Sequence, residues 1–453
     1  MKLKFNIPDP VNHILQELNE YGHEAYVVGG CVRDSILNIE PHDWDICTSA
    51  TPDEILEIFS DENIIPTGLK HGTVTIMIDG NPYEVTTFRV DGEYTDSRRP
   101  DSVCFTDNLI EDLKRRDFTI NAMAYNSSSG LIDPFNGEVD LQNNLLKCVG
   151  NPNDRFKEDA LRILRAMRFA VKYRLDIENT TYEAMITNRD GLKNISKERI
   201  TSELEKMLTC GNEIKNLFLY CSDIITVIIP ELECCIGFDQ HNKYHKHTVY
   251  EHILSVVDFC DSDDFVIKMA ALLHDIGKPS TYTEDEEGYG HFYGHPEVSY
   301  EISKEVLSKR LRVSNDQYDE ILLLVKYHDM DLANTKRSVK RALNKLGESA
   351  LKKWAILKFA DRKDHIGFSE EKVRSNLSRI EEISDIIIST HDCFTIKELS
   401  VNGGDLIGIG YTPGKELGDI LKHLLQLVID GCENDKDKLL EIAASLRTKE
   451  AGV

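Results

Sequence analysis

The sequence predicts an α+β protein in which a small mixed α/β region is followed by an all-α body. Alternating apolar and polar residues over 72–78 and 83–88, separated by the turn-forming segment 79–82, predict a β-hairpin. From Arg155 onward the apolar residues instead recur at helical spacing. Because 453 residues exceed what one ordinary core holds, we expect several domains.

The composition is typical of a globular protein without membrane spans. Hydrophobic residues make up 41% of the chain and charged residues 29%. No apolar run approaches the roughly 20 residues that cross a bilayer, and the N-terminus lacks a signal-peptide core, so we expect no membrane partner. The 11 cysteines form no C-x-x-C pair, which favours reduced thiols and a cytoplasmic location. The sequence does not specify an oligomeric state.

The net charge of −25 argues against nucleic-acid binding over the whole surface. Basic residues nevertheless cluster at Arg98-Arg99, at 114–116 and along 162–174, whereas acidic residues dominate segments such as 284–287. A basic groove on an acidic body is compatible with this pattern, and the composition does not decide the matter.

The first elements that we expect are an amphipathic helix over 11–22 and a buried strand over 25–28. The strand ends at Gly29-Gly30 and opens a helix that contains Arg33. Glycines allow backbone N–H groups to approach an anion, and a helix N-terminus favours negative charge. This segment therefore predicts a phosphate-binding turn.

Two aspartates one residue apart, Asp43 and Asp45, come next. In an extended strand alternate side chains share a face, so we expect both carboxylates to point the same way. Such a pair suits Mg²⁺, which takes one or two carboxylates together with substrate phosphates. A solvated aspartate pair at a strand end is the alternative. Glu84, in the predicted hairpin, offers a third carboxylate, although an exposed glutamate is the simpler interpretation.

The remainder of the N-terminal region divides into a loop and a basic segment. Residues 91–114 carry many charges with weak periodicity, which predicts a mobile loop. The following residues place Arg116, Asp117 and Asn121 beside an apolar stretch. Arginine binds phosphate in a bidentate manner, and an amide contacts a sugar or a base. A surface ion-pair cluster is the alternative.

The helix predicted from Arg155 onward has two contrasting faces at about 100° per residue. One face is apolar and the other basic. A stripe of arginines suits a polyphosphate or an RNA backbone, and a solvated face is the alternative. The apolar face consists of Ala160, Ile163, Leu164, Met167 and Ala170, and the basic face consists of Arg162, Arg165, Arg168 and Lys172.

Four short motifs occur in a specific order along the chain. They are Gly29-Gly30-x-x-Arg33-Asp34, Asp43-x-Asp45, Arg115-Arg116-Asp117-Phe118-Thr119-x-Asn121-Ala122 and Glu158-Asp159-x-x-Arg162. In this order and spacing the sequence resembles the class II tRNA nucleotidyltransferases, which are the CCA-adding enzymes and the bacterial poly(A) polymerases. The similarity continues to residues 405–418.

The resemblance implies a polymerase-β-like nucleotidyltransferase head that adds CCA to the 3′ end of tRNA from CTP and ATP. Asp43 and Asp45 would hold catalytic Mg²⁺ ions for two-metal nucleotidyl transfer. The loop over 91–114, with Arg98 and Arg99, would switch the enzyme from CTP to ATP. The resemblance implies nucleotide-binding roles for Gly29, Gly30, Arg33, Arg116, Asp117, Asn121, Asp159, Arg162, Arg165 and Arg168, among which Asp159 and Arg162 would face the base.

The second half of the chain is rich in histidine. In residues 270–279 a short apolar stretch is followed by His274-Asp275 and then by Gly277 and Pro279. Separated His and Asp residues are typical of metal sites. This part resembles an HD domain, which implies a second divalent metal and a phosphohydrolase; a remnant without metal is the alternative. The implied ligands are His252, His274, Asp275 and Asp361, with His295 and His328 as further pocket residues and His241, His245 and His247 crowded upstream.

We therefore expect four segments: a nucleotidyltransferase head (1–150), a helical neck and body that binds the base and RNA (151–235), an HD domain (236–370) and a helical tail (371–453). The leading hypothesis is CCA addition to tRNA. A poly(A) polymerase is one alternative, and an enzyme that adds only A or only CC is a variant. An HD phosphohydrolase whose N-terminal half only binds RNA is the other alternative.

Overall fold

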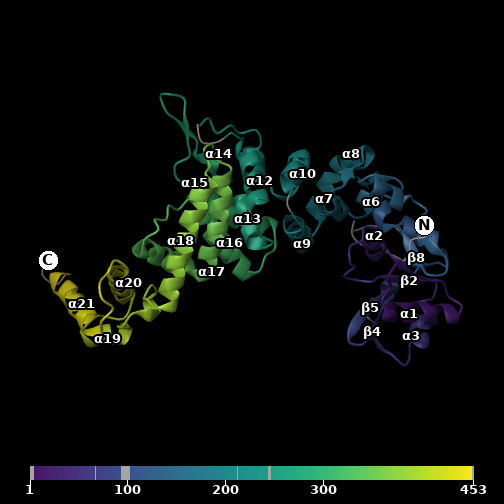
Figure 1. Cartoon of the computed structure of the whole chain (residues 1–453), viewed down its shortest axis with the longest axis horizontal. Helices are drawn as coiled ribbons and strands as arrows, with labels where there is room; N and C mark the ends of the chain where they lie inside the picture. The colour runs from purple at the N-terminus through teal and green to yellow at the C-terminus, as the bar shows by residue number, and fades with distance from the viewer. Residues whose placement is uncertain (1–4, 67, 93–102, 212, 243–245, 451–453) are drawn as a thin grey trace. The chain divides into compact units, whose positions relative to one another are not determined.

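A computed structural model of the chain has a mixed β-sheet in its N-terminal part and is helical over most of the remainder (Figure 1). This confirms the predicted α+β class, with a small mixed head followed by a helical body. Among the helices that the structure describes, none combines the length and the apolar character of a membrane span. The structure describes residues 5–450 apart from 67, 93–102, 212 and 243–245.

The chain forms two compact units. The first contains residues 1–230 with 310–312, and the second contains residues 231–309 with 313–453. The four predicted segments subdivide these units, and their boundaries stay predictions. The predictions made for Arg98, Arg99 and His245 fall outside the described residues.

The sheet of the first unit has seven strands in the order β3-β4-β5-β2-β1-β8-β9. Strands β2 and β5 are parallel, and the other neighbouring pairs are antiparallel. Strand β1 is buried at each position, in keeping with the apolar run that predicted it. The strands are β1 (Ala25–Val28), β2 (Ile46–Thr48), β3 (Asn63–Ile65), β4 (Thr73–Ile78), β5 (Asn81–Thr87), β8 (Ala124–Asn126) and β9 (Gly130–Ile132).

The predicted hairpin is confirmed. Strands β4 and β5 pair in antiparallel register up to Ile78 opposite Asn81. The two residues at the tip, Asp79 and Gly80, have φ values of 52° and 78°. Positive φ at both central residues is the conformation of the two-residue turn that matches the twist of paired strands.

The prediction of a loop over 91–114 is wrong at both ends of this range. Strand β6 (Arg89–Asp91) pairs with β7 (Val103–Phe105), and helix α4 (Leu109–Lys114) follows. The Asn108 side chain caps α4 by accepting the Ile110 N–H. Elements of three to six residues are too short to show a hydrophobic period in the sequence, which explains the error.

The helix predicted from Arg155 is two helices, α6 (Pro152–Glu158) and α7 (Leu161–Tyr173), with Asp159 in an extended conformation between them. The apolar face predicted for this segment is confirmed as buried. The other helices of the first unit are α1 (Asp9–Glu20), α2 (Gly30–Ile36), α3 (Pro52–Ile58), α5 (Gly137–Gln142), α8 (Asn179–Asn188), α9 (Lys197–Leu208), α10 (Ile214–Tyr220) and α11 (Ser222–Ile228), and the short strands β10 (Leu145–Leu146) and β11 (Asp176–Ile177) pair in parallel.

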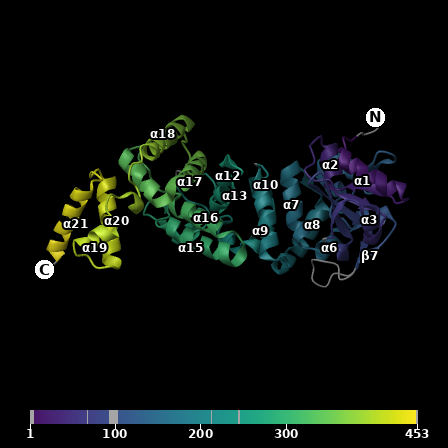
Figure 2. The same cartoon turned by 90° about the horizontal axis from the view of Figure 1, so that it is seen from below.

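The core of the second unit is a group of helices around α13, which is buried at all its positions (Figure 2). Helix α13 packs against α12, α16 and α17, and α15 packs against α16. Buried Lys268 of α13 donates hydrogen bonds to the carbonyls of Val257 and Cys260, so its charge does not disrupt the core. The helices are α12 (Val249–Phe259), α13 (Phe265–Leu273), α14 (Lys278–Thr281), α15 (His295–Glu305), α16 (Asn315–Tyr327) and α17 (Lys336–Lys363).

A hairpin and a helical tail complete the second unit. Strands β12 (Thr283–Glu284) and β13 (Gly290–His291) form a short antiparallel hairpin between α14 and α15. The tail has its own apolar cluster, which includes Leu406, Leu424 and Leu439. The tail helices are α18 (Glu370–Ser389), α19 (Gly403–Gly408), α20 (Lys415–Ile429) and α21 (Lys436–Glu450).

Candidate functional sites

Asp43 and Asp45 lie on the chain immediately before β2 rather than within a strand, which corrects the expected strand geometry. The Asp45 carbonyl accepts a hydrogen bond from the Val28 N–H (3.0 Å), which ties this segment to β1. The Asp45 side chain reaches solvent, yet partial burial raises its pKa; Arg116 opposes this rise and the Asp43 carboxylate adds to it. Both carboxylates and one arginine therefore share one electrostatic environment.

Glu84 joins this pair of aspartates. Strands β2 and β5 are parallel neighbours in the interior of the sheet with Ile46 opposite Val85, so Glu84 lies beside Asp45 where β2 begins. Burial raises the pKa of Glu84, and the carboxylates of Asp45 and Asp43 raise it further. Glu84 is exposed, as the simpler interpretation of the sequence expected. Its closeness to the aspartates was not predictable, because the pairing of β5 with β2 is not encoded in any local pattern.

The Gly29-Gly30 turn has the predicted position. Gly29 has a φ of 78°, and a Cβ at this position would lie 3.0 Å from Nη1 of Arg116. Its N–H donates to the Met123 carbonyl (3.1 Å), so this one N–H is already paired, and the phosphate-binding role of the turn stays a prediction. The glycine also leaves room for the Arg116 guanidinium.

Arg116 is a cation whose charge acts on the Asp45 carboxylate. Its Nη2 lies 3.3 Å from Oδ2 of Asp112, a carboxylate that is itself buried. Its Nε is buried and has no hydrogen-bond partner within the described part of the chain. A buried cationic donor without a partner is rare in a folded protein and fits an anionic ligand.

Arg33 is only 5% exposed and belongs to a network that joins two of the predicted motifs to helix α7. Its Nε donates to Asp34 (2.9 Å), its Nη1 to the Asn121 side-chain oxygen and its Nη2 to the Tyr173 hydroxyl. The guanidinium also stacks on the Tyr173 ring, 4.4 Å from its centroid. Arg33 is thus positioned by its neighbours, as a preorganised cation must be.

The network continues from Asn121 to Asp117 and Arg165. The Asn121 amide donates to Oδ1 of Asp117 (3.0 Å), and Arg165 donates twice to Oδ2 (2.7 and 2.9 Å). Burial by itself raises the pKa of Asp117, but the charge of Arg165 and the hydrogen bond from Asn121 outweigh it and hold the pKa well below its usual range. Arg33, Asn121, Asp117 and Arg165 therefore lie together, although they come from two separate motifs and from the basic face of α7.

The predicted basic face of α7 is largely neutralised by carboxylates of the same chain. Arg162 pairs with Glu158 (2.6 Å) and Arg168 with Glu203 (2.6 Å). The predicted binding of a polyphosphate or RNA by this face stays a prediction. Glu158 is only four residues from Arg162, whereas Glu203 lies on α9 and reaches Arg168 through the packing of α9 on α7.

Asp159 has a partner that sequence reasoning missed. Its two oxygens accept hydrogen bonds from Arg199 of α9 (2.6 and 3.3 Å). Arg199 and Glu203 are four residues apart on α9, a spacing that places them on one helix face. That spacing was the available signal for a basic and acidic pair facing α7.

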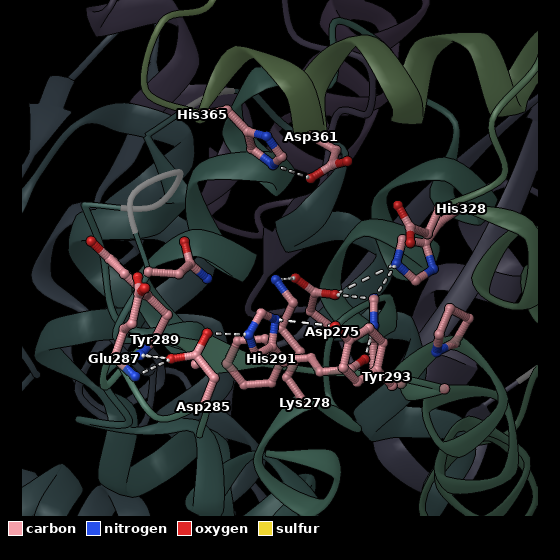
Figure 3. Close-up of a pocket in the computed structure, with 17 residues that line it drawn as sticks. Asp275, Lys278, Asp285, Glu287, Tyr289, His291, Tyr293, His328, Asp361 and His365 are labelled. Atoms are coloured by element: carbon pink, nitrogen blue, oxygen red, sulfur yellow. Dashed lines mark hydrogen bonds and ion pairs between the residues drawn. The ribbon is translucent and has the colours of Figure 1, made fainter. Parts of the chain in front are cut away.

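The second unit contains a buried cluster of histidines around Asp275 (Figure 3). Its members come from five elements, and the sequence-predicted residues of the second site all lie in it. Three groups of donor atoms within 4.8 Å of one another fit a metal ion: His252, His274 and Asp275; His252, Asp361 and His365; and Asp275, His295 and His328.

In four of the histidine rings the Nδ1 atom lies next to an oxygen atom of the protein. Nδ1 of His274, His295 and His328 lies 2.7–2.8 Å from a backbone carbonyl, and Nδ1 of His252 lies 2.9 Å from Asp364. Such contacts favour the Nδ1–H tautomer and leave Nε2 as the ligand atom. Asp364 is a further residue that the sequence did not single out.

The ring nitrogens converge in two pairs, one on each oxygen of Asp275. Nε2 of His252 and Nε2 of His274 are 3.4 Å apart and lie 3.2 and 3.3 Å from Oδ2. Nε2 of His295 and Nε2 of His328 are 3.1 Å apart and lie 3.2 and 3.5 Å from Oδ1. Converging lone pairs repel one another unless a proton or a metal ion lies between them, so this donor set fits divalent cations.

The direction of the pKa shifts also shows that the carboxylates of this cluster favour a positive charge. Burial lowers the pKa of His252, but hydrogen bonds with Asp275, Asp361 and Asp364 outweigh it and raise the pKa to about 10. Burial raises the pKa of Asp275, and His274 and Lys278 more than reverse this effect. Oδ1 of Asp275 is also buried without a hydrogen bond in the described residues, as expected for a ligand atom.

A pocket of about 670 Å³ opens onto this cluster. Asp285, Glu287 and Tyr289 line one side and His328 the other, with Asp275 and Lys278 between them (Figure 3). This volume lies within the range of small-molecule sites.

Family models match three parts of the chain. The poly A polymerase head domain matches residues 25–147, and the HD domain matches residues 248–364. A third family, described as a probable RNA and SrmB-binding site of polymerase A, matches residues 174–235.

Individual relatives agree. The CCA-adding enzyme of Limosilactobacillus reuteri is 49% identical over 225 residues, 50% of this chain and 55% of the relative, so the alignment spans about half the length of the first relatives matched. The CCA-adding enzyme of Enterococcus faecalis is 34% identical over 439 residues, 96% of this chain and 95% of the relative. The structure of the Bacillus stearothermophilus CCA-adding enzyme in complex with CTP superposes with a TM-score of 0.68 at 27% identity, covering 99% of this chain and 100% of that one. Since the Enterococcus relative aligns along nearly the whole sequence, the chain belongs to the family of CCA-adding enzymes and carries an HD domain.

Proposed function

We propose that this chain adds CCA to the 3′ end of tRNA, using CTP and ATP. The observation that carries the proposal is the grouping of Asp43, Asp45 and Glu84 with Arg116, whose buried Nε has no partner in the described residues. Carboxylate oxygens suit Mg²⁺, and the adjacent cation suits a triphosphate. Family membership supports the same reaction.

In this proposal Asp43, Asp45 and Glu84 hold Mg²⁺. Bound divalent ions in such sites lower the pKa of the attacking hydroxyl and neutralise the departing pyrophosphate. The side chains of the protein contribute position and charge. Arg116 and Arg33 face the triphosphate, and because both are held by neighbours, little reorganisation is needed when the nucleotide binds.

Base selection is assigned to Asp159 and Arg162. A carboxylate accepts and a guanidinium donates, so together they match the mixed Watson–Crick edges of cytosine and adenine. Without nucleotide these groups are held by Arg199 and Glu158. We propose that the base replaces part of these contacts, which keeps the buried charges paired in both states.

For the HD domain we propose a divalent metal site that supports phosphoester hydrolysis. His252, His274, Asp275 and Asp361 are the first ligand set, and the second pair of imidazoles on Asp275 offers a second position. In hydrolysis water adds to phosphorus, the ester P–O bond breaks, and the leaving oxygen takes a proton. Metal analysis of the purified protein, compared with a His274→Ala variant, tests the ligand assignment.

The decisive experiment for the head is extension of a tRNA that lacks its CCA end. Each nucleotide is supplied alone with Mg²⁺, and then CTP and ATP are supplied together. Addition of C, C and A followed by a stop is the expected result. A long A tail from ATP alone would identify a poly(A) polymerase instead, and no extension by a folded protein would overturn the proposal.

A further inference from the structure

Helix α7 presents a strip of three side chains to the head of the first unit. Arg165, Phe169 and Tyr173 follow one another at intervals of four residues, a spacing that places them along one side of the helix. Arg165 donates to Asp117, and Tyr173 contacts Arg33 from the other end of the strip. The strip therefore meets the network of the proposed nucleotide site at two separate points.

The Tyr173 hydroxyl forms a closed group of hydrogen bonds with two neighbours on α2. It accepts from Nη2 of Arg33 (2.5 Å) and donates to Oδ1 of Asp34 (3.0 Å). The same oxygen of Asp34 accepts from Nε of Arg33 (2.9 Å) and lies 2.8 Å from its Nη2. Because each of the three groups bonds to the other two, these contacts are made together in one orientation of the guanidinium.

The Tyr173 ring adds a second constraint on Arg33. The central carbon of the guanidinium lies 4.4 Å from the centroid of this ring and 5.3 Å from that of Phe169. A cation within about 6 Å of an aromatic centroid is attracted to the ring face. Tyr173 is only half-buried, so its contacts with Arg33 and Asp34 form a large part of its role in the fold.

The hydroxyl keeps its proton at neutral pH. Burial raises the pKa of Tyr173, Arg33 opposes this rise, and the charge and hydrogen bond of Asp34 add to it, so the pKa reaches about 12. Tyr173 therefore remains a donor to Asp34 under the conditions of an enzyme assay.

The placement of Arg33 also affects a second residue of the proposed site. Nη1 of Arg33 donates to the side-chain oxygen of Asn121, and the Asn121 amide donates to Asp117. Asn121 is buried, so a displaced Arg33 would leave its oxygen without this donor. A change at Tyr173 would thus reach both Arg33 and Asn121.

We propose that Tyr173 is a positioning residue of the nucleotidyltransferase site, whose hydroxyl holds the Arg33 guanidinium in the orientation that meets the triphosphate. This inference rests on the nucleotide addition proposed for the head and adds to it a residue that lies outside all four sequence motifs. Because CTP and ATP share the triphosphate, the hydroxyl serves both nucleotides equally and does not take part in base selection.

The test combines Tyr173→Phe, which removes only the hydroxyl, with Arg33→Lys, each alone and both together in the full-length protein. Tyr182→Phe is the matched control, since Tyr182 is also half-buried and its hydroxyl donates to the Tyr220 carbonyl (2.8 Å). The KM and kcat for CTP are measured on tRNA without its CCA end, and those for ATP on tRNA that ends in CC. Calorimetry measures the binding of CTP with Mg²⁺ in the absence of tRNA, and thermal unfolding verifies that each variant is folded.

We expect Tyr173→Phe to raise the KM for CTP, the KM for ATP and the Kd of CTP by the same factor, about tenfold, because one hydrogen bond to a charged group is lost. The KM for tRNA should not change. In the Arg33→Lys background the loss of the hydroxyl should have no further effect, because Tyr173 acts through the guanidinium. Tyr182→Phe should keep the wild-type KM for both nucleotides.

Three results would overturn the positioning role of Tyr173: an unchanged CTP affinity in Tyr173→Phe, unequal effects on CTP and ATP, or a full tenfold effect in the Arg33→Lys background. Failure of the proposed function gives a different result. A wild-type protein that binds CTP but extends no tRNA would refute nucleotide addition, while calorimetry on the variants would still decide the role of Tyr173. A folded wild type that does not bind CTP would refute both.

Discussion

Asp117, which we propose for the nucleotide site, also pairs with a cation of helix α7 within the first unit. It lies before the short helical turn that carries Asn121, and Arg165 reaches it from α7. The pairing joins the sheet region to the helical neck through buried charges. At this scale, the partner of a side chain matters as much as its type, because each charge needs a compensating group.

Asp117→Asn should destabilise the first unit by about 2 kcal/mol at pH 7, because Arg165 loses its charged partner. The effect is moderate because the Arg165 side chain is partly exposed. The folded pKa of Asp117 is lowered, so its contribution is present above the unfolded value of about 4 and is lost as pH falls below it. The difference in denaturant midpoint between wild type and variant should therefore shrink below about pH 4. Asp190→Asn, in an exposed pair with Lys193, should show no such difference; a pH-independent difference for Asp117→Asn would contradict the assignment.

Glu84→Gln should reduce CTP incorporation about 10- to 100-fold and increase the Mg²⁺ concentration needed for half-maximal rate, because one oxygen ligand loses its charge. A magnesium titration of single-nucleotide addition measures both effects. Glu57→Gln, an exposed glutamate of α3, is the control. If the magnesium requirement of Glu84→Gln equals that of the control, Glu84 is not a ligand.

At the scale of elements, the unit of strand β1, the glycine turn and helix α2 positions several predicted groups at once. The turn admits the Arg116 guanidinium, and α2 directs Arg33 toward Asn121 and Tyr173. In the HD domain the ends of α13 and α16 and the start of α15 carry metal-ligand candidates. Candidate site residues gather at helix and strand termini because several elements can bring their side chains to one point there.

Gly29→Ala should destabilise the first unit by about 2 kcal/mol and impair nucleotide addition. Its backbone, with φ 78° and ψ −122°, is strained for any residue with a Cβ, and that Cβ would displace Arg116. Thermal unfolding and CTP incorporation check the two effects. Gly80→Asn is the matched control, because Gly80 also has positive φ but faces open space; equal effects at the two positions would show that the Arg116 contact is unimportant.

At the scale of the whole molecule, the two sites lie in separate compact units. The nucleotidyltransferase residues all belong to the first unit, and the histidine cluster belongs to the second. The residues proposed for each site lie within one unit, so we expect the two chemistries to be separable.

Replacing Asp43 and Asp45 together by alanine should abolish tRNA extension and leave metal-dependent phosphoester hydrolysis intact. His274→Ala should have the reverse effect and lower the bound-metal content. Parallel assays of extension, hydrolysis and metal content provide the measurement. Loss of hydrolysis with retained extension in the Asp43/Asp45 variant would refute the two-site assignment.

The sequence by itself determined the features that depend on neighbouring residues. Alternation and an Asp-Gly turn predicted the β4–β5 hairpin, and helical spacing predicted the buried face of α7. Motif order predicted the family, and the HD pattern identified residues that converge in one cluster. These signals are local because turn chemistry and periodicity act over a few residues.

Only the tertiary structure decided which distant groups meet. The pairing of β5 with β2 sets Glu84 beside Asp45, and the packing of α9 on α7 gives Asp159 its Arg199 partner. The two pairs of Nε2 atoms around Asp275 likewise depend on helices far apart in the chain. No local pattern encodes such contacts, because they follow from how whole elements bury their apolar faces against one another.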